Sequence, residues 1–135
     1  MINKAILIGN TGKDPEIRTT SAGKKVATFS LATSDNRKND KGEKITTTSW
    51  HNIVAWSPLA EVMESYVKKG QQLYIEGRIN YREYTTADGV KKYVTEIVAN
   101  TIQMIGAKKQ EEHKADPQPA TGAQVQNDPD DGLPF

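Results

Sequence analysis

Several segments within the first hundred residues alternate apolar and polar side chains, and this period of two constrains the fold more than any other feature. The clearest segment is 26–34, where Ala27, Phe29 and Leu31 point one way and small, mostly polar residues point the other. Neighbouring side chains of a β-strand lie on opposite faces, so this pattern predicts a half-buried strand. Alternation or a high content of β-branched and aromatic residues predicts further strands at 4–9, 46–56, 72–85 and 91–105, and an extended stretch at 16–20.

Only one segment has the period of an α-helix. Its apolar residues follow the i, i+3, i+4, i+7, i+8 spacing of a buried helix face and are Leu59, Val62, Met63, Tyr66 and Val67. Ser57 is suited to capping the start of this helix, and Pro58 suits its first turn. Gly70 suits the exit, since glycine readily adopts the left-handed conformation.

The order of elements is therefore strand, strand, strand, helix, strand, strand. This order is typical of the OB-fold, a five-stranded Greek-key barrel. The predicted class is all-β: a five-stranded OB-fold barrel with one short helix between strands 3 and 4. Another small α+β arrangement has the same order of elements.

The apolar pattern stops after residue 106. Residues 107–127 contain mainly Ala, Lys, Gln, Glu, Pro, Thr and Gly, with Val125 as the one larger apolar residue. Such a segment cannot bury enough apolar surface to offset the entropy of ordering, which predicts a disordered linker. The sequence thus divides into a domain at 1–106, a linker at 107–127 and an acidic tip at 128–135.

Charge is distributed unevenly along the chain. Residues 1–109 carry 17 Lys and Arg against 11 Asp and Glu, whereas residues 110–135 carry one Lys against six acidic residues. The basic part suits a polyanionic partner, and the acidic part suits a basic protein surface.

Several classes of protein are excluded. The chain has no cysteine, so disulfide frameworks and thiolate metal sites are absent. The glycines of the segment 9–14 (GNTGKD) are too close together for a phosphate-binding loop, and the two histidines, His51 and His113, form no metal or triad pattern. No stretch reaches the length of a signal peptide core or a membrane span, so we expect a cytoplasmic protein. Because the sequence shows no catalytic or metal-binding pattern, we also expect that the protein is not an enzyme and has no metal or cofactor.

Aromatic and basic residues on the predicted strands form a candidate nucleic-acid site. Stacking of bases needs flat aromatic surfaces, and the phosphate backbone needs cations. Trp50, Trp56 and Tyr84 lie on strand faces that also carry polar residues, and Arg78 and Arg82 share the face of Tyr84. Lys38 lies in a polar loop that can fold over a strand. The alternative is that the tryptophans are core residues and the lysines are simply solvated.

The acidic tip is a candidate protein-binding motif. Its aspartates precede Leu-Pro-Phe, and an aromatic side chain beside a carboxylate suits an apolar pocket with a basic rim. The residues concerned are Asp130, Asp131, Leu133, Pro134 and Phe135. The alternatives are a tail without a role or a contact with the basic part of the same chain.

Six sequence blocks resemble the bacterial single-stranded DNA-binding protein family over essentially the whole chain. They are 3–10 (NKAILIGN), 13–18 (KDPEIR), 26–33 (VATFSLAT), 59–62 (LAEV), 66–70 (YVKKG) and 74–78 (YIEGR). The tip resembles the acidic Asp-Asp-x-x-Pro-Phe ending of that family.

The resemblance implies an OB-fold, a homotetramer, and stacking of bases on Trp50, Trp56 and Tyr84. It also implies backbone cations at Lys68, Lys69 and Arg82, and docking of the tip onto replication, repair and recombination enzymes. The family often carries a further stacking aromatic in the loop after the second strand, where this chain has Arg37, whose guanidinium can stack more weakly.

The expected function is sequence-independent binding and protection of single-stranded DNA during replication, repair and recombination. One alternative is an OB-fold adaptor that acts mainly through protein contacts. A metal-dependent nuclease is a third, but it needs a cluster of carboxylates that the sequence does not supply.

Overall fold

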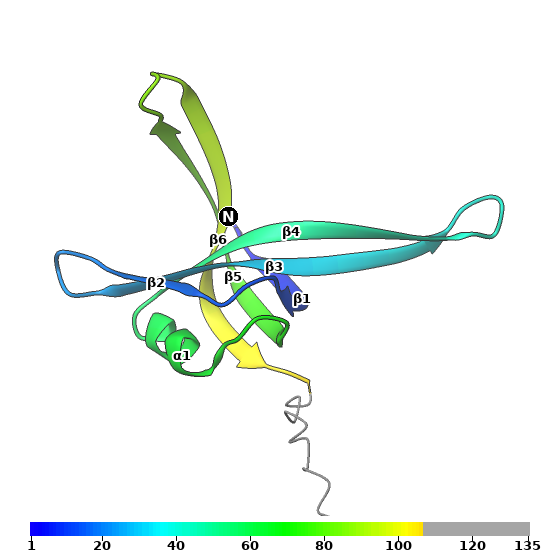
Figure 1. Cartoon of the computed structure of the whole chain (residues 1–135), viewed down its shortest axis with the longest axis horizontal. Coiled ribbons are helices and arrows are strands. Elements are labelled where there is room, and N and C mark those ends of the chain that lie inside the picture. The colour runs from blue at the N-terminus through cyan, green and yellow to red at the C-terminus, as the bar shows by residue number, and fades with distance from the viewer. Residues whose placement is uncertain (107–135) are drawn as a thin grey trace, which may run out of the picture.

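The computed structural model describes residues 1–106, and the predicted linker and tip lie outside the described residues. The described part has six strands and one helix (Figure 1). In chain order they are β1 (Ala5–Thr11), β2 (Glu16–Thr19), β3 (Lys25–Lys38), β4 (Lys44–Trp56), α1 (Leu59–Tyr66), β5 (Gln72–Thr85) and β6 (Lys91–Met104).

Five of the strands close into a barrel in the order β1-β5-β6-β4-β3, and β1 pairs with β3 to complete the circle. The closing pairs are Asn10 with Ala32 and Thr11 with Leu31. Only β4 and β6 run parallel; every other pair is antiparallel. The short strand β2 pairs with β3 alone, at an edge. The OB-fold prediction is therefore confirmed, and β2 corresponds to the extended stretch predicted at 16–20.

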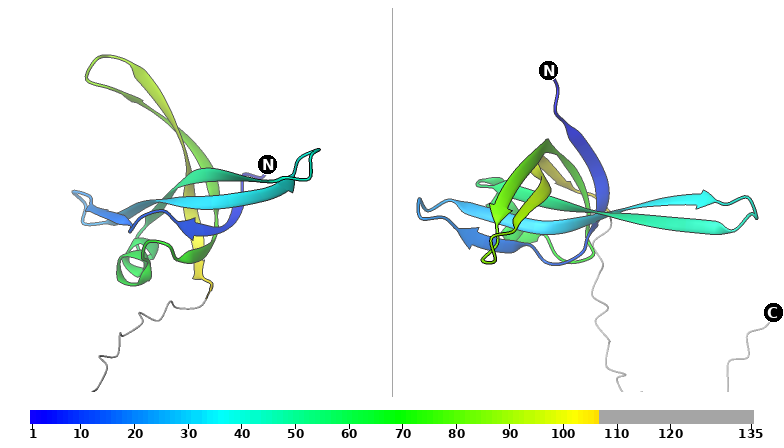
Figure 2. Two further views of the ribbon diagram at one scale, coloured as in Figure 1. Left: turned by 45° about the vertical axis from the view of Figure 1, so that its right-hand side comes forward. Right: turned by 90° about the horizontal axis from the view of Figure 1, so that it is seen from above.

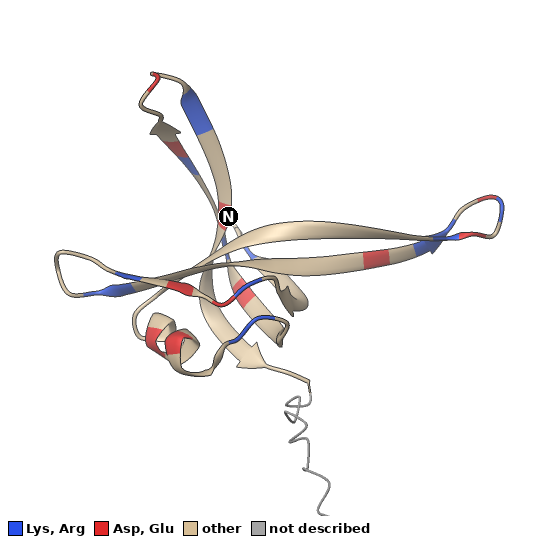
Figure 3. Cartoon of the chain, in the orientation of Figure 1, with Lys and Arg blue, Asp and Glu red and all other residues tan. Residues whose placement is uncertain are grey.

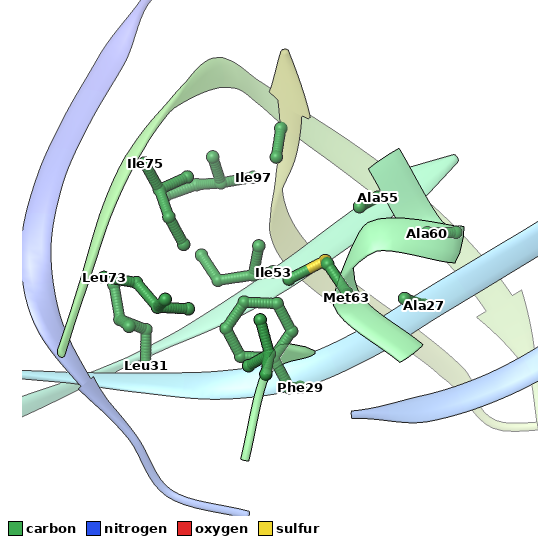
Figure 4. Close-up of a cluster of buried hydrophobic side chains, with 12 residues drawn as sticks. Ala27, Phe29, Leu31, Ile53, Ala55, Ala60, Met63, Leu73, Ile75 and Ile97 are labelled. Atoms are coloured by element: carbon green, nitrogen blue, oxygen red, sulfur yellow. The ribbon is translucent and has the colours of Figure 1, made fainter. Parts of the chain in front are cut away.

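The inner faces of the strands form one hydrophobic core (Figure 4). Ala27, Phe29 and Leu31 of β3 are buried, as the alternation predicts. They pack with side chains from the neighbouring strands and with Met63 of α1. The largest fully buried side chains are Leu31, Ile53, Met63, Leu73, Ile75 and Val67. Burial of these side chains, at about 1.5–3 kcal/mol each, is the main source of stability.

Helix α1 covers the barrel beside β3 and is shorter and more exposed than predicted (Figure 2). The prediction that Ser57 caps it was wrong, because the Ser57 hydroxyl bonds to the backbone of Lys25 at the start of β3. Met63 is buried, but Val62 and Tyr66 are exposed, so a narrower stripe than expected faces the core. Within residues 1–106, no helix has the length and hydrophobicity needed to cross a membrane.

Two hairpins project from the barrel in different directions (Figures 1 and 2). The β3–β4 arm is the part of that hairpin between residues 33 and 50, and the β5–β6 arm lies between residues 79 and 97. Strands β3, β5 and β6 have 14 residues each, which corresponds to about 46 Å of extended chain and exceeds what the barrel wall needs. Tyr81 has the same parity as the buried residues Leu73 and Ile75 of β5, but it is 75% exposed because the strand has left the barrel there.

Candidate nucleic-acid interface

The two tryptophans lie on the outer face of β4. They occupy even positions, whereas Ile53 and Ala55 occupy odd positions and are fully buried. Trp50 is 62% exposed and Trp56 is 45% exposed. These indole rings are therefore surface groups and not core groups, so a planar ligand can reach them.

Gly12 lies directly against the indole ring of Trp50. A Cβ atom at Gly12 would lie 2.5 Å from Cζ3 of Trp50 and 2.7 Å from Oγ of Ser30, so only glycine leaves room for the ring in this position. Sequence reasoning recognised a turn at 9–12 but missed this contact. Nothing in the sequence links Gly12 to Trp50, because β1 and β4 are brought together only through β3.

The turn that holds Gly12 also anchors two of the predicted cations. The hydroxyl of Thr11 donates to the carbonyl of Lys68 over 2.6 Å, and the amide of Lys69 donates to Oδ1 of Asp14 over 2.7 Å. Gly70, in the left-handed region at φ 81°, donates its amide to the carbonyl of Thr11. The structure thus brings Lys68 and Lys69, both exposed, to the same turn as the Trp50 ring.

The outer face of β4 continues across β6 onto β5. The parallel register pairs Val54 with Val98, and Val98 is in turn opposite Arg78. Further along the β5–β6 arm, Tyr84 is opposite Lys92 on the same face and is 41% exposed. Arg78 and Tyr84 therefore share one continuous surface with the outward side chains of β4.

Arg82 lies between these two residues and contacts a carboxylate. Its Nε atom donates to Oε2 of Glu96 over 3.2 Å, and Asn80 donates to Oε1 of the same carboxylate over 3.1 Å. The Cζ atom of Arg82 lies 6.0 Å from the centre of the Tyr84 ring. Sequence reasoning did not single out Glu96 as a partner of this face, although its even position on β6 was a usable signal.

Arg37 and Lys38 lie on opposite faces of the β3–β4 arm. Lys38 shares the even face with Trp50, directly opposite Lys44 at the end of the arm. Arg37 occupies the odd face, where it lines a shallow hollow of about 370 Å³ together with Thr33, Ser34, Asp35, Thr47 and Ser49. The structure therefore does not bring Arg37 to the face of the tryptophans.

Basic residues lie in both arms, at the β2–β3 hairpin and at the turn after α1 (Figure 3). Among residues 1–106, Arg82 is the one predicted cation that forms an ion pair; Arg37, Lys38, Lys68, Lys69 and Arg78 form none. The same part of the chain holds no group of three or more His, Asp or Glu side chains placed to bind a metal.

A separate polar group lies on the outer side of β1 and β5. Lys4 and Glu76 form an ion pair over 3.0 Å, and this hydrogen bond lowers the pKa of Glu76 and raises that of Lys4. Partial burial, followed by a hydrogen bond to Glu76, raises the pKa of Tyr74. The pair lies next to Ile6 and Ile8, whose side chains are exposed.

The comparisons with known proteins all point to one family. A model of the single-strand binding protein family matches residues 2–105. A single-stranded DNA-binding protein of Chlorobaculum tepidum is 49% identical over 108 residues, which cover 79% of this chain and 67% of the relative. One from Bacteroides thetaiotaomicron is 39% identical over 159 aligned residues, which cover 99% of both chains. A relative from Xanthomonas campestris is 46% identical, but the chain spans only 62% of its length.

Two solved structures share the fold. The SSB of Plasmodium falciparum in complex with ssDNA superposes with a TM-score of 0.69 at 34% identity, covering 78% of this chain and 94% of that one. A single-stranded DNA-binding protein of Thermus aquaticus also gives 0.69, at 27% identity, covering 79% and 52%. These proteins are named for binding DNA and not for a catalysed reaction, which agrees with the expectation of a non-enzymatic chain. The chain belongs to the single-strand binding protein family.

Proposed function

We propose that this protein binds single-stranded DNA without sequence preference on the outer face that carries Trp50, Trp56 and Tyr84. The observation that carries the proposal is the exposure of these three rings on a surface that also holds cations without an ion pair among the described residues. Relatives with the same fold are named for binding single-stranded DNA, and one solved relative is a complex with it.

Binding has two physical components. Lys38, Lys68, Lys69 and Arg78 replace counterions along the phosphate backbone, so affinity falls as salt rises. The aromatic rings accept any base because every base has a flat π-face, and each stacked base contributes roughly 1–3 kcal/mol. Duplex DNA binds more weakly, since its paired bases cannot reach the rings.

A fluorescence titration tests this function. The full chain is titrated with labelled oligo(dT), a mixed-sequence strand and the corresponding duplex, and tryptophan quenching is followed at several salt concentrations. We expect quenching by both single strands, similar affinities for them, and weaker binding of duplex. No preference for single strands over duplex would instead support the adaptor function. Cleavage of the DNA when Mg²⁺ or Mn²⁺ is added would support a nuclease.

We further propose that the tip, Asp130, Asp131, Leu133, Pro134 and Phe135, recruits replication, repair and recombination enzymes to the bound DNA. The support is its composition: an acidic, aromatic end suits a basic, apolar pocket on another protein. Deleting 128–135 is expected to abolish recruitment of such enzymes to immobilised single strands, while DNA affinity stays the same or rises slightly. Loss of DNA binding on deletion would contradict a separate role for the tip. A cytoplasmic location at the nucleoid belongs to the same proposal.

A homotetramer is the assembly that we propose. Its support in this chain is the exposed pair Ile6 and Ile8 on β1, beside the Lys4–Glu76 ion pair, a mixed apolar and charged surface suited to contact between copies. The native mass measured in solution tests this, and a monomeric mass at micromolar concentration would contradict it.

A further inference from the structure

Glu96 is an unusual residue for a surface proposed to bind a polyanion. It lies on the outer face of β6, and only 8% of the residue is exposed. A buried carboxylate is costly unless hydrogen bonds and an opposite charge compensate it. Both of its oxygens are satisfied, one by the Asn80 amide at 3.1 Å and the other by Arg82 Nε at 3.2 Å. The carboxylate is therefore a fixed component of the proposed DNA surface.

This contact determines how Arg82 is presented. The side chain of Arg82 is 55% exposed, while Glu96 holds it through Nε. Because the carboxylate is bonded at Nε, neither terminal NH₂ group of the guanidinium is hydrogen-bonded to it in this structure. The Cζ atom of Arg82 lies over the Tyr84 ring at 6.0 Å from its centre, so the guanidinium is a second flat group next to that ring. Guanidinium planes stack on aromatic groups, which an ammonium group cannot do in the same way.

The same contact cancels the charge of Arg82. At 3.2 Å from the carboxylate, the pair carries no net charge toward an incoming phosphate. The salt dependence of binding counts the phosphates that protein cations neutralise. Lys92, opposite Tyr84 on the same face, has no such ion pair within residues 1–106. The charge of Arg82 is thus compensated by a carboxylate, whereas that of Lys92 on the same arm is not compensated by any ion pair within residues 1–106.

We propose that Glu96 is a positioning residue of the DNA interface, which makes Arg82 an extension of the Tyr84 stacking platform and not a phosphate-neutralising cation. This inference rests on the proposed function and refines the backbone role that the family resemblance implies for Arg82. It assigns the arm a stacking unit composed of Tyr84 and Arg82, with Lys92 as the adjacent phosphate contact.

The test measures the affinity of the full chain for labelled oligo(dT) from low to high NaCl, and the slope of log K against log[NaCl]. Glu96→Gln releases the charge of Arg82, so the slope should steepen by about 0.7, the value for one additional phosphate on a single strand. The double variant Arg82→Gln/Glu96→Gln keeps the net charge, so its slope should equal that of the wild type while affinity falls roughly two- to fivefold. Lys92→Gln is the matched control and should flatten the slope by about 0.7.

The outcomes separate the inference from the function on which it rests. An unchanged slope in Glu96→Gln, or a slope flattened by about 0.7 in the double variant, would overturn the role of Glu96 even if the wild type binds single strands well. Failure of the wild type to bind would overturn the proposed function itself. A merely structural Glu96 would lower affinity equally at all salt concentrations. Thermal unfolding shows whether each variant folds; if Glu96→Gln does not fold, the double variant, in which no buried charge is left, decides.

Discussion

The barrel and the two arms consist of the same strands but differ in what their side chains contact. On β4, Ile53 and Ala55 are fully buried in the barrel, whereas Trp50, near the base of the arm, is mostly exposed. On β5, Leu73 and Ile75 are buried, whereas Tyr81 and Tyr84 of the arm are exposed. Backbone pairing continues from barrel to arm in both hairpins, with one register shift between Glu76 and Gly77 of β5.

Because of this difference, the barrel side chains contribute to stability and the arm side chains are available for binding. In the barrel, apolar side chains leave water when the protein folds, so they stabilise it. Beyond the base of each arm both sheet faces meet water, so the aromatic side chains there gain little on folding. Their apolar surface remains available, and a stacked base can bury it instead. Substitutions in the two regions should therefore affect different measurements.

The largest effect is expected in the barrel. Phe29→Ala removes a buried ring from the core and should lower the free energy of unfolding by about 3–5 kcal/mol. Tyr93→Ala is the matched control, because Tyr93 also lies on the inner face of its strand but is 77% exposed on the arm; its effect should stay within about 0.5 kcal/mol. Urea unfolding measures both. Equal losses would mean that the arm is packed in solution.

Next in size is the effect of the tryptophans on binding. Trp50→Ala and Trp56→Ala should each weaken oligonucleotide binding by about 1–3 kcal/mol, the contribution of one stacked base. The unfolding midpoint should change little, because both rings are exposed. Tyr81→Ala, on the opposite face of the β5–β6 arm, serves as control. Affinity equal to that of the wild type at every salt concentration would refute a stacking role.

A smaller effect is expected at Gly12. In Gly12→Ala the new methyl group would overlap the Trp50 ring and displace it, so DNA affinity should fall, but by less than in Trp50→Ala. In a chain that already carries Trp50→Ala, the same change should have little further effect on DNA affinity, because the ring is gone and the remaining close atom, Oγ of Ser30, belongs to a side chain that can rotate away. A double-mutant cycle measures this coupling. Additive losses would show that Gly12 acts independently of Trp50.

The smallest effect concerns pH and the barrel surface. The ion pair with Lys4 lowers the pKa of Glu76 below its ordinary value of 4.5. Its contribution to stability is therefore complete above pH 4.5 and is lost as the pH falls through the lowered pKa. Glu76→Gln should reduce the unfolding temperature slightly at pH 7 and not at all in strong acid. A difference that persists in acid would exclude the ion pair as its cause.

Much of the proposed site followed from the strand period. Trp50 and Trp56 share a parity opposite to that of Ile53. The sequence left open that they are core residues, and their exposure in the structure excludes that alternative. Arg78 and Tyr84 were placed on one face by the same reasoning. Arg37 and Lys38 were both assigned to the loop after the second predicted strand, but their parity differs, and the structure directs them to opposite faces of the arm. Attention to the strand period would have separated them.

The helix shows the limit of such reasoning. The periodic stripe from Leu59 to Val67 predicted its existence, but α1 contacts the barrel along one narrow line, which leaves Val62 and Tyr66 in solvent. The Ser57 side chain is suited to capping a helix, but its hydroxyl bonds instead to the backbone of Lys25 in the adjacent strand β3. A sequence pattern does not show whether a side chain will bond to a nearby backbone group or to one that is distant in the sequence.

The sequence by itself determined the inward face of β3, the number and order of the main elements, and the division between a basic domain and an acidic tail. These properties depend on local periodicity and composition, which every segment carries. Only the tertiary structure decided where each strand leaves the barrel, that Gly12 lies under Trp50, and that Glu96 holds Arg82. Those contacts depend on strand register and barrel closure, which are set by the packing of the whole domain and not by any one segment.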